Sequence, residues 1–214
     1  MVVVKVEAAN VPSPRSELLA EAVCDWVLDH GVAALSLRPL ARDLGTSTFS
    51  LVYWFGSKEG VVAAALERSE RRQQQMIGAW AEEAGFVAPG ALFRRYWSWS
   101  SSAEGRPYLR LFVELSGLAQ RSDDLRGYVD RAIAPWRGLL EAMLARAEIE
   151  RADVAARATL LSASIAGLQL DLATSGDVAR TTAAAELLAT RLDEFGRLDL
   201  DAFNDAWATL TGRY

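Results

Sequence analysis

The sequence predicts an all-α fold. The helix-favouring residues Leu, Ala, Arg and Glu dominate, apolar residues recur at three- and four-residue spacing, and the alternation typical of strands is missing. Glycine and proline interrupt this pattern at intervals that suit the ends of helices. The 214 residues are enough for one large domain, or for a small module joined to a larger one.

The N-terminal pattern predicts three short helices followed by a longer one. Ser13 is a suitable N-cap with Pro14 at the first helical position, and Gly31 ends the first helix. The expected ranges are 13–30, 37–45, 48–55 and 57–83. Only residues 45–47 lie between the second and third helices, and this spacing is typical of a helix-turn-helix.

Longer helices are expected after Gly90, at about 90–103, 107–119, 123–146, 151–174, 179–195 and 199–211. The boundary between the two halves of the chain falls inside the fourth helix. We therefore expect two domains, residues 13–60 and 61–214, that share this helix without a flexible linker.

The second and third helices carry residue types that suit DNA reading. The first turn of a recognition helix meets base edges in the major groove, and Thr48, Phe49 and Ser50 occupy that turn. Lys58 begins the fourth helix, where the helix dipole favours a phosphate. The candidate DNA-binding residues are Arg38, Ser47, Thr48, Phe49, Ser50, Tyr53 and Lys58. On spacing alone, a three-helix pack with a polar outer face stays open as the alternative.

The N-terminal segment resembles a known family. Residues 15–62 read RSELLAEAVCDWVLDHGVAALSLRPLARDLGTSTFSLVYWFGSKEGVV. This stretch is similar to the N-terminal domain of the TetR/AcrR family of transcriptional regulators. The matching features are the Gly31 turn, Ser36-Leu37-Arg38, Leu40-Ala41, Leu44-Gly45, Ser47, Leu51, Phe55, Ser57-Lys58-Glu59 and the apolar residue that follows.

Two positions depart from the family pattern. The family usually has Tyr where this chain has Val52, and His where it has Trp54, with Tyr53 between them. A displacement of one residue rotates a helical side chain by ~100°. We expect Phe55 to pack inward and Tyr53 to face the DNA backbone. For Trp54 two placements stay open, packing against the fourth helix or contact with the sugar-phosphate edge.

The charge balance does not favour bulk attraction to DNA. The net charge is −5, and residues 1–72 hold eight Lys or Arg and nine Asp or Glu, a net charge of −1. In a two-fold dimer each phosphate contact is doubled, and each contributes to the salt-dependent part of the affinity. We therefore expect modest non-specific binding and more reliance on contacts within the groove.

In the C-terminal half, the helix expected at about 151–174 has two faces to bury. Its second face is built mostly of small residues, and the next helix is its natural companion. Two such helices from each subunit make a four-helix interface, as the family resemblance also implies. The candidate dimerisation residues are Ala155, Thr159, Ser162, Ala166, Gln169, Ala184, Leu188 and Arg191. The alternative is a larger monomeric bundle that buries both faces internally.

An aromatic-rich group lies between the two regions described so far. The resemblance places an effector pocket among these helices, and pockets are usually apolar with a few polar groups. The candidate ligand-binding residues are Tyr96, Trp97, Trp99, Phe112, Glu114, Tyr128, Trp136 and Met143. Each aromatic residue taken alone is equally consistent with ordinary core packing. Pro135 interrupts a helical pattern, either as a kink that widens a cavity or as a simple adjustment.

The sequence does not resemble that of an enzyme. Cys24 is the only cysteine, which excludes an internal disulfide and a cysteine-based zinc cluster, and His30 is the only histidine. No Ser/His/Asp set, phosphate-binding glycine loop or metal-ligand cluster stands out, so we expect no enzyme activity, no cofactor and no metal. No apolar run reaches ~18 residues and the N-terminus lacks a secretion signal, so we expect a cytoplasmic protein without a membrane partner.

These observations together predict a homodimeric DNA-binding transcriptional regulator, a repressor of a palindromic operator in double-stranded DNA. An apolar or aromatic small molecule would modulate its binding. The alternative is a ligand-binding or interaction module whose DNA-reading face is degenerate.

Overall fold

The computed structural model describes residues 14–145, 152–194 and 198–211. Within them the chain forms ten helices and one pair of two-residue strands, so the predicted all-α fold is confirmed. The N-terminal helices are α1 (Pro14–His30), α2 (Leu37–Asp43), α3 (Thr48–Phe55) and α4 (Lys58–Ala84). The remaining helices are α5 (Pro89–Ser101), α6 (Arg106–Leu118), α7 (Asp123–Leu144), α8 (Val154–Ser175), α9 (Val178–Asp193) and α10 (Leu200–Thr211).

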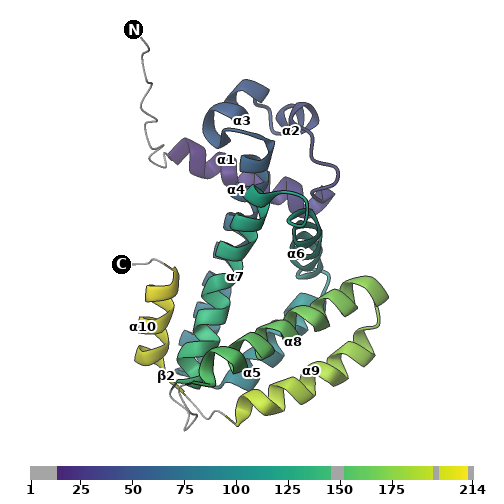
Figure 1. The fold of residues 1–214 in the computed structure, drawn as a ribbon. Coiled ribbons are helices and arrows are strands. Elements are labelled where there is room, and N and C mark those ends of the chain that lie inside the picture. Colours follow the sequence, from purple (N-terminus) through teal and green to yellow (C-terminus); the bar gives the residue numbers. More distant parts are fainter. Residues whose placement is uncertain (1–13, 146–151, 195–197, 212–214) are drawn as a thin grey trace.

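The molecule is elongated, with the three short helices at one end (Figure 1). Helix α4 leaves this end and runs without interruption into the larger part, where it packs beside α7. Helices α8 and α9 form a hairpin at the far end, and α10 stands against α7 and α4. Strands β1 (Phe86–Val87) and β2 (Leu198–Asp199) pair antiparallel and tie the start of α10 to the chain that follows α4.

The short helices share one small apolar core, centred on the fully buried Leu40 and Leu51. Gly56 ends α3 with a φ of +77°, in the left-handed region that favours glycine. Ser57 then caps α4, where its Oγ accepts a hydrogen bond from the Gly60 amide at 3.1 Å. Local signals of this kind explain why the N-terminal boundaries follow the sequence prediction closely.

Ion pairs fasten α4 to α1. The Arg68 guanidinium binds Glu17 and lies 3.0 Å from Glu21, and Arg72 binds Glu21 and lies 2.7 Å from Asp25. The Arg68 side chain is largely buried, so solvent screens its pairs less than it screens an exposed pair. The part of α4 up to Arg72 is therefore fixed to α1 by ion pairs.

The larger part has two further apolar clusters. One joins α5 to α8 and α9 around Phe93, Ala158 and Ala189. The other joins α10 to α4 and α7, where the buried Phe203 packs with Ile77 and Met143. Helix α7 continues through Pro135 from Asp123 to Leu144. In the described part of the chain, no helix is both long and apolar enough to cross a membrane.

Candidate DNA-reading face and effector cavity

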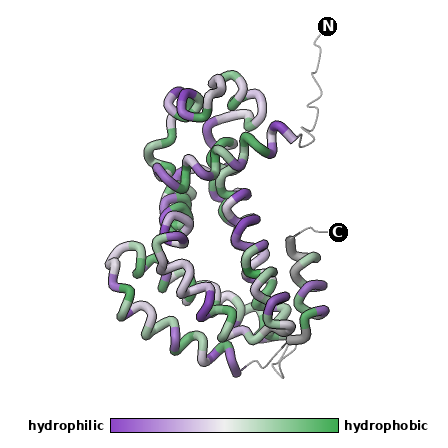
Figure 2. Tube along the Cα trace, turned by 180° about the vertical axis from the view of Figure 1, so that it is seen from behind, coloured by the Kyte–Doolittle hydropathy of each residue, from purple (hydrophilic) through white to green (hydrophobic). Residues whose placement is uncertain are grey.

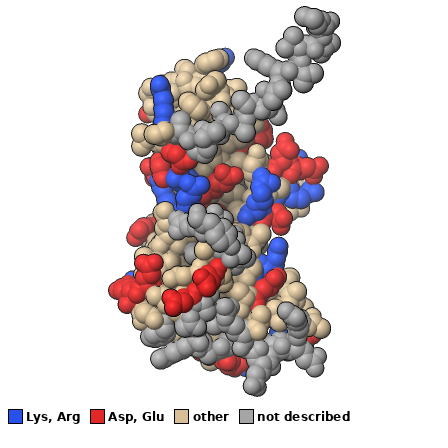
Figure 3. All heavy atoms as spheres, turned by 90° about the vertical axis from the view of Figure 1, so that its left-hand side faces the viewer, with Lys and Arg blue, Asp and Glu red and all other residues tan. Residues whose placement is uncertain are grey.

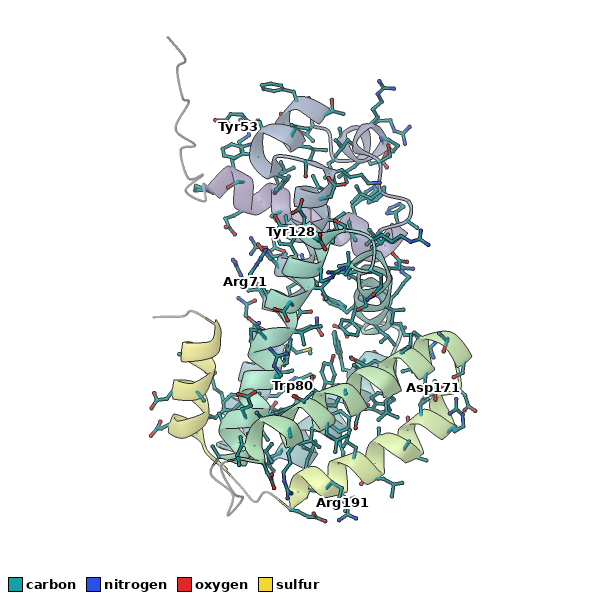
Figure 4. All side chains as sticks on the ribbon, viewed as in Figure 1. Tyr53, Arg71, Trp80, Tyr128, Asp171 and Arg191 are labelled. Atoms are coloured by element: carbon teal, nitrogen blue, oxygen red, sulfur yellow. The ribbon has the colours of Figure 1, made fainter. Side chains whose placement is uncertain are left out.

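The third helix presents an exposed aromatic surface at the end of the molecule. Phe49 is 77% exposed and Tyr53 is 59% exposed, and their rings stack with centroids 6.2 Å apart. Tyr53 projects from the upper end of the molecule in Figure 4. Exposure of two large rings on one short helix is unusual for a surface that binds no partner and is typical of a recognition surface.

The start of α3 is held by its own hydroxyl groups. The Ser47 Oγ accepts a hydrogen bond from the Ser50 amide at 3.0 Å, and the two hydroxyls lie 2.9 Å apart. Ser47 is therefore an N-cap as well as a candidate DNA contact. Thr48 is exposed beside this pair. Arg38 at the start of α2 and Lys58 at the start of α4 are also exposed.

The two positions that depart from the family pattern have different environments. Val52 is exposed, whereas Trp54 is half-buried and lines a hollow with residues of α1 and α4, among them Glu67 and Arg71. Of the two placements left open for Trp54, the structure has the packing one. Phe55 packs against the N-terminal core, as expected.

The surface near this hollow carries charges of both signs. Positive and negative side chains are intermixed around the middle of the molecule in Figure 3. Arg71, labelled in Figure 4, belongs to this region and forms an ion pair with Glu17 at 3.6 Å. Arg68, Arg71 and Arg72 thus all form ion pairs with acidic side chains of α1.

A cavity of about 180 Å³ lies within the larger part, lined by residues of α4, α5, α6, α7, α8 and α9. Five of the eight predicted ligand-binding residues line it: Tyr96, Trp99, Phe112, Trp136 and Met143. Tyr108 adds another ring, and apolar side chains such as Ile77 and Leu139 complete much of the wall. A largely apolar cavity with a few polar groups is the usual form of a small-molecule site.

The polar groups of the cavity form a connected chain across four helices. The Trp136 Nε1 donates to Glu70 Oε2 at 2.6 Å, and the Gln73 amide nitrogen lies 3.4 Å from Glu70 Oε1. The Tyr96 hydroxyl donates to Gln73 Oε1 at 3.3 Å and accepts from Gln169 Nε2 at 2.8 Å. The chain thus links α7, α4, α5 and α8 around the cavity.

Glu70 supplies the carboxyl group of this series of hydrogen bonds. Burial raises the pKa of its carboxyl from 4.5 to about 7, against the lowering effect of the hydrogen bonds from Trp136 and Gln73. Burial, together with the Glu70 charge, also raises the pKa of the Tyr96 phenol. A carboxyl with a pKa near 7 changes its charge within the physiological range.

Trp99 contributes a donor that has no acceptor. Its Nε1 is buried and forms no hydrogen bond. The indole ring lies between Tyr96 and Tyr108, with centroid distances of 5.9 and 5.1 Å. A buried N–H without an acceptor is rare in folded proteins, because the group has lost its hydrogen bonds to water.

Three predicted ligand-binding residues lie outside this cavity. Trp97 is rotated by ~100° from Tyr96 on α5, so it faces α9, where its Nε1 donates to Thr182 Oγ1 at 3.0 Å. The Glu114 carboxylate accepts a hydrogen bond from the Val32 amide at 2.6 Å. Tyr128, near the start of α7, packs against the N-terminal core. The number of aromatic residues in a segment did not show which of them lie on the helix face that lines the cavity.

Sequence reasoning also missed the polar residues that α4 contributes. Glu70 and Gln73 lie three residues apart, and Ile77 follows after four more, so all three occupy one face of the helix. Polar residues that interrupt the buried face of an amphipathic helix are the signal that could have identified them.

The predicted dimerisation residues divide into two groups. Ser162, Ala166 and Gln169 line the cavity, so the small-residue face of α8 is turned inward in its middle part. Ala184, Leu188 and Arg191 line an exposed groove between α8 and α9, and Ala155 and Thr159 are exposed near the start of α8. Small side chains at positions 162 and 166 leave the space that the cavity occupies.

The outward face of α8 and α9 is apolar in places. Leu160 is 67% exposed, Leu170 is 50% exposed and Leu187 is 72% exposed. Hydrophobic and hydrophilic residues alternate along both helices in Figure 2. Asp171 and Arg191, at opposite ends of this hairpin in Figure 4, both line the exposed groove. Large exposed apolar side chains on neighbouring helices are typical of a protein interface.

Helices α4 and α6 each contact both the cavity and the N-terminal helices. In α4, Glu70 lines the cavity, and Arg72, two residues later, binds α1. In α6, Phe112 lines the cavity, while Arg110 donates to the Leu28 carbonyl and Glu114 accepts from Val32. Both helices therefore connect the cavity wall directly to the N-terminal helices.

Comparison with known proteins agrees with this architecture. Residues 95–197 match a family model described as the C-terminal region of BetI-type transcriptional repressors. No curated protein sequence matches the chain. A putative TetR-family regulator from Rhodococcus sp. has a similar structure, with a TM-score of 0.66 and 21% identity over 84% of this chain and 97% of its own.

Two further solved structures have the same fold. A putative transcriptional regulator from Saccharomonospora viridis in complex with choline has a TM-score of 0.64 and 17% identity, over 88% of this chain and 100% of its own. Reduced NemR from E. coli has a TM-score of 0.62 and 20% identity, over 83% and 96%. The proteins of similar fold are described as transcriptional regulators. The chain therefore has the fold of TetR-family regulators, and its residues 95–197 are similar to the C-terminal region of BetI-type repressors.

Proposed function

We propose that the chain is a cytoplasmic homodimeric repressor. The third helix of each subunit binds one half of a palindromic operator, and a small molecule with an apolar or aromatic body binds in the cavity and weakens operator binding. The observation that carries this proposal is the double role of α4 and α6, which line the cavity and also bind the N-terminal helices. The choline complex of the S. viridis regulator supports effector binding in this fold.

The DNA-reading residues divide by what they contact. Thr48, Phe49 and Ser50 meet base edges in the major groove, and Phe49 can contact a thymine methyl. Tyr53, Arg38 and Lys58 bind phosphates, and Lys58 is favoured by the N-terminal end of α4. All of these residues except the half-buried Ser50 are exposed on α2, α3 and the start of α4, which supports this division.

Dimerisation uses the outward face of α8 and α9. The exposed Leu160, Leu170 and Leu187 support this choice, because a monomeric bundle would bury them. Predicted contacts at Ala184, Leu188 and Arg191 lie on the same face. Leu187→Glu should shift the protein towards monomers in sedimentation experiments, whereas Leu118→Glu, an exposed leucine on α6, should not. An unchanged dimer in Leu187→Glu would place the interface elsewhere.

The regulator function is tested first by a gel-shift titration over a salt series, against the DNA that flanks the protein's own coding region. A specific, salt-sensitive shift by two subunits is expected. Lys58→Ala should weaken binding to all sequences, Thr48→Ala should alter the sequence preference, and Arg95→Ala on α5 should change neither. Unchanged DNA affinity in both of the first two variants would remove the assigned reading face.

The second candidate is a ligand-binding module with a degenerate reading face. The negative charge balance and the departures at Val52 and Trp54 favour it. Selection from random duplexes separates the two functions. An enriched palindrome supports the repressor, and the absence of any enriched sequence supports the module.

A further inference from the structure

The exposed face of α3 carries no charge. The helix reads TFSLVYWF, so it contains no Lys, Arg, His, Asp, Glu, Asn or Gln. Thr48, Phe49, Val52 and Tyr53 are exposed, and their spacing places them on one side of the helix. The upper end of the molecule, where α3 lies, is mostly uncharged in Figure 3. This face therefore meets its partner with aromatic rings, methyl groups and hydroxyls.

This face lacks the side chains that most sharply distinguish the bases by hydrogen bonds. In the major groove, guanine is read by bidentate Arg or Lys and adenine by bidentate Asn or Gln, and α3 contains none of these. A hydroxyl both donates and accepts, so the Thr48 and Ser50 hydroxyls distinguish bases less sharply than a bidentate pair does. The Ser50 hydroxyl also lies 2.9 Å from the Ser47 Oγ at the helix cap. Hydrogen bonds from α3 therefore supply only part of the discrimination that an operator requires.

Apolar contact is the other way to read a base in the major groove. The 5-methyl group of thymine is the apolar feature among the base edges there. Phe49 is exposed at the start of α3, and Val52 is exposed about one turn later. The Phe49 ring stacks on that of Tyr53 with 24° between the ring planes, and Tyr53 meets Trp54 edge to face at 4.9 Å. Neighbouring rings therefore hold Phe49 in position on the exposed face.

The basic side chains near α3 belong to neighbouring helices. Arg38 lies in the first turn of α2, and Lys58 begins α4, where the helix dipole adds to its attraction for a phosphate. Arg42 forms an ion pair with Asp43 at 2.9 Å. Phosphate contacts position a protein on DNA and carry no sequence information directly. Phosphate binding and base reading are therefore assigned to different helices.

We propose that α3 selects its half-site through the 5-methyl groups of thymines, with Phe49 as the residue that determines the specificity and Val52 as its apolar neighbour. This inference rests on the proposed function, because it takes α3 as the reading helix. Each half-site then contains a thymine where Phe49 binds, and the N7 acceptors of guanines contribute little to the choice of sequence.

The test begins with selection of a binding site from random duplexes by the full-length protein. Each thymine of the selected duplex is then replaced by uracil, which removes the methyl group and keeps every hydrogen-bonding group of the base. Loss of a contacted methyl group should weaken binding about fourfold in one half-site and about fifteenfold in both, as expected for one buried carbon group per subunit. The dependence of the affinity on salt should not change, because no phosphate contact is lost. Replacement of guanines by 7-deazaguanine, which lacks the N7 acceptor, should have little effect.

Phe49→Ala is the matched variant. Because the Phe49 side chain is largely exposed, its removal leaves the core of the N-terminal helices intact. The variant should bind the thymine and uracil duplexes with equal affinity at the contacted position. Leu118→Ala, which removes a partly exposed side chain from α6, should keep the preference for thymine.

Equal affinity of the parent protein for the thymine and uracil duplexes would overturn the proposal. A thymine preference that persists in Phe49→Ala, or a larger loss with 7-deazaguanine than with uracil, would also overturn it. In these cases the selected duplex still shows sequence-specific DNA binding, so the regulator function survives the loss of this inference. If no duplex is enriched, both the reading helix and the inference fail.

Discussion

The buried carboxyl of Glu70 predicts a measurable dependence of stability on pH. The native pKa of about 7 exceeds the ordinary value of 4.5, so between these two values the folded chain binds more protons than the unfolded one. The free energy of unfolding therefore falls as pH rises through this window. Below pH 4.5 the penalty is absent, and above pH 7 it is present in full. The difference in pKa corresponds to about 3 kcal/mol.

Glu70→Gln removes this penalty, because glutamine carries no charge at any pH and its side-chain oxygen can still accept the Trp136 hydrogen bond. The free energy of unfolding of the variant, minus that of the parent, should increase by about 3 kcal/mol between pH 4.5 and 8. Other carboxyls, such as Glu17 and Asp43, have lowered pKa values, but they are the same in both proteins and cancel in the difference.

The assay is urea unfolding at several pH values, at one protein concentration, because dimerisation would otherwise change the apparent stability. Glu82→Gln is the matched control, since it removes an exposed carboxylate from the same helix. Its difference from the parent should not change with pH. A difference for Glu70→Gln that also stays constant across the range would refute the reasoning that Glu70 is buried without a counter-charge.

Three further predictions concern other positions. Gly60→Ala places a Cβ 1.8 Å from the Phe55 carbonyl oxygen and should cost more than about 2 kcal/mol in urea unfolding. Gly78→Ala, with no atom within 4 Å of the new Cβ, should instead stabilise α4 by about 1 kcal/mol. Phe203→Ala should cost about 3–5 kcal/mol in the same assay, and a smaller loss would mean that α10 is loosely attached.

The helix-turn-helix was predictable because its signals are local. Gly45 and Gly56 end helices with positive φ. Ser47 and Ser57 then cap the helices that follow, each by a hydrogen bond to an amide three residues later. These interactions involve neighbouring residues only, so a sequence pattern contains all of their information. The family resemblance rests on the same segment.

The two-residue strands were not predictable in this way. Strand β1 follows α4 and β2 precedes α10, so their pairing joins segments more than a hundred residues apart. Neither strand has a periodicity long enough to identify it. The attachment of α10 beside the cavity wall follows from this pairing and from the burial of Phe203.

The sequence by itself was enough to predict the helical class, the helix-turn-helix and the resemblance to a regulator family, since each depends on contacts between near neighbours. The tertiary structure alone decided which face of each long helix meets the cavity. It turned Trp97 towards α9 and Tyr96 towards Glu70, although the two residues are adjacent in the chain. A helix rotates its side chains by ~100° per residue, so membership of a cavity depends on how the helices pack against one another, and composition does not contain that rotation.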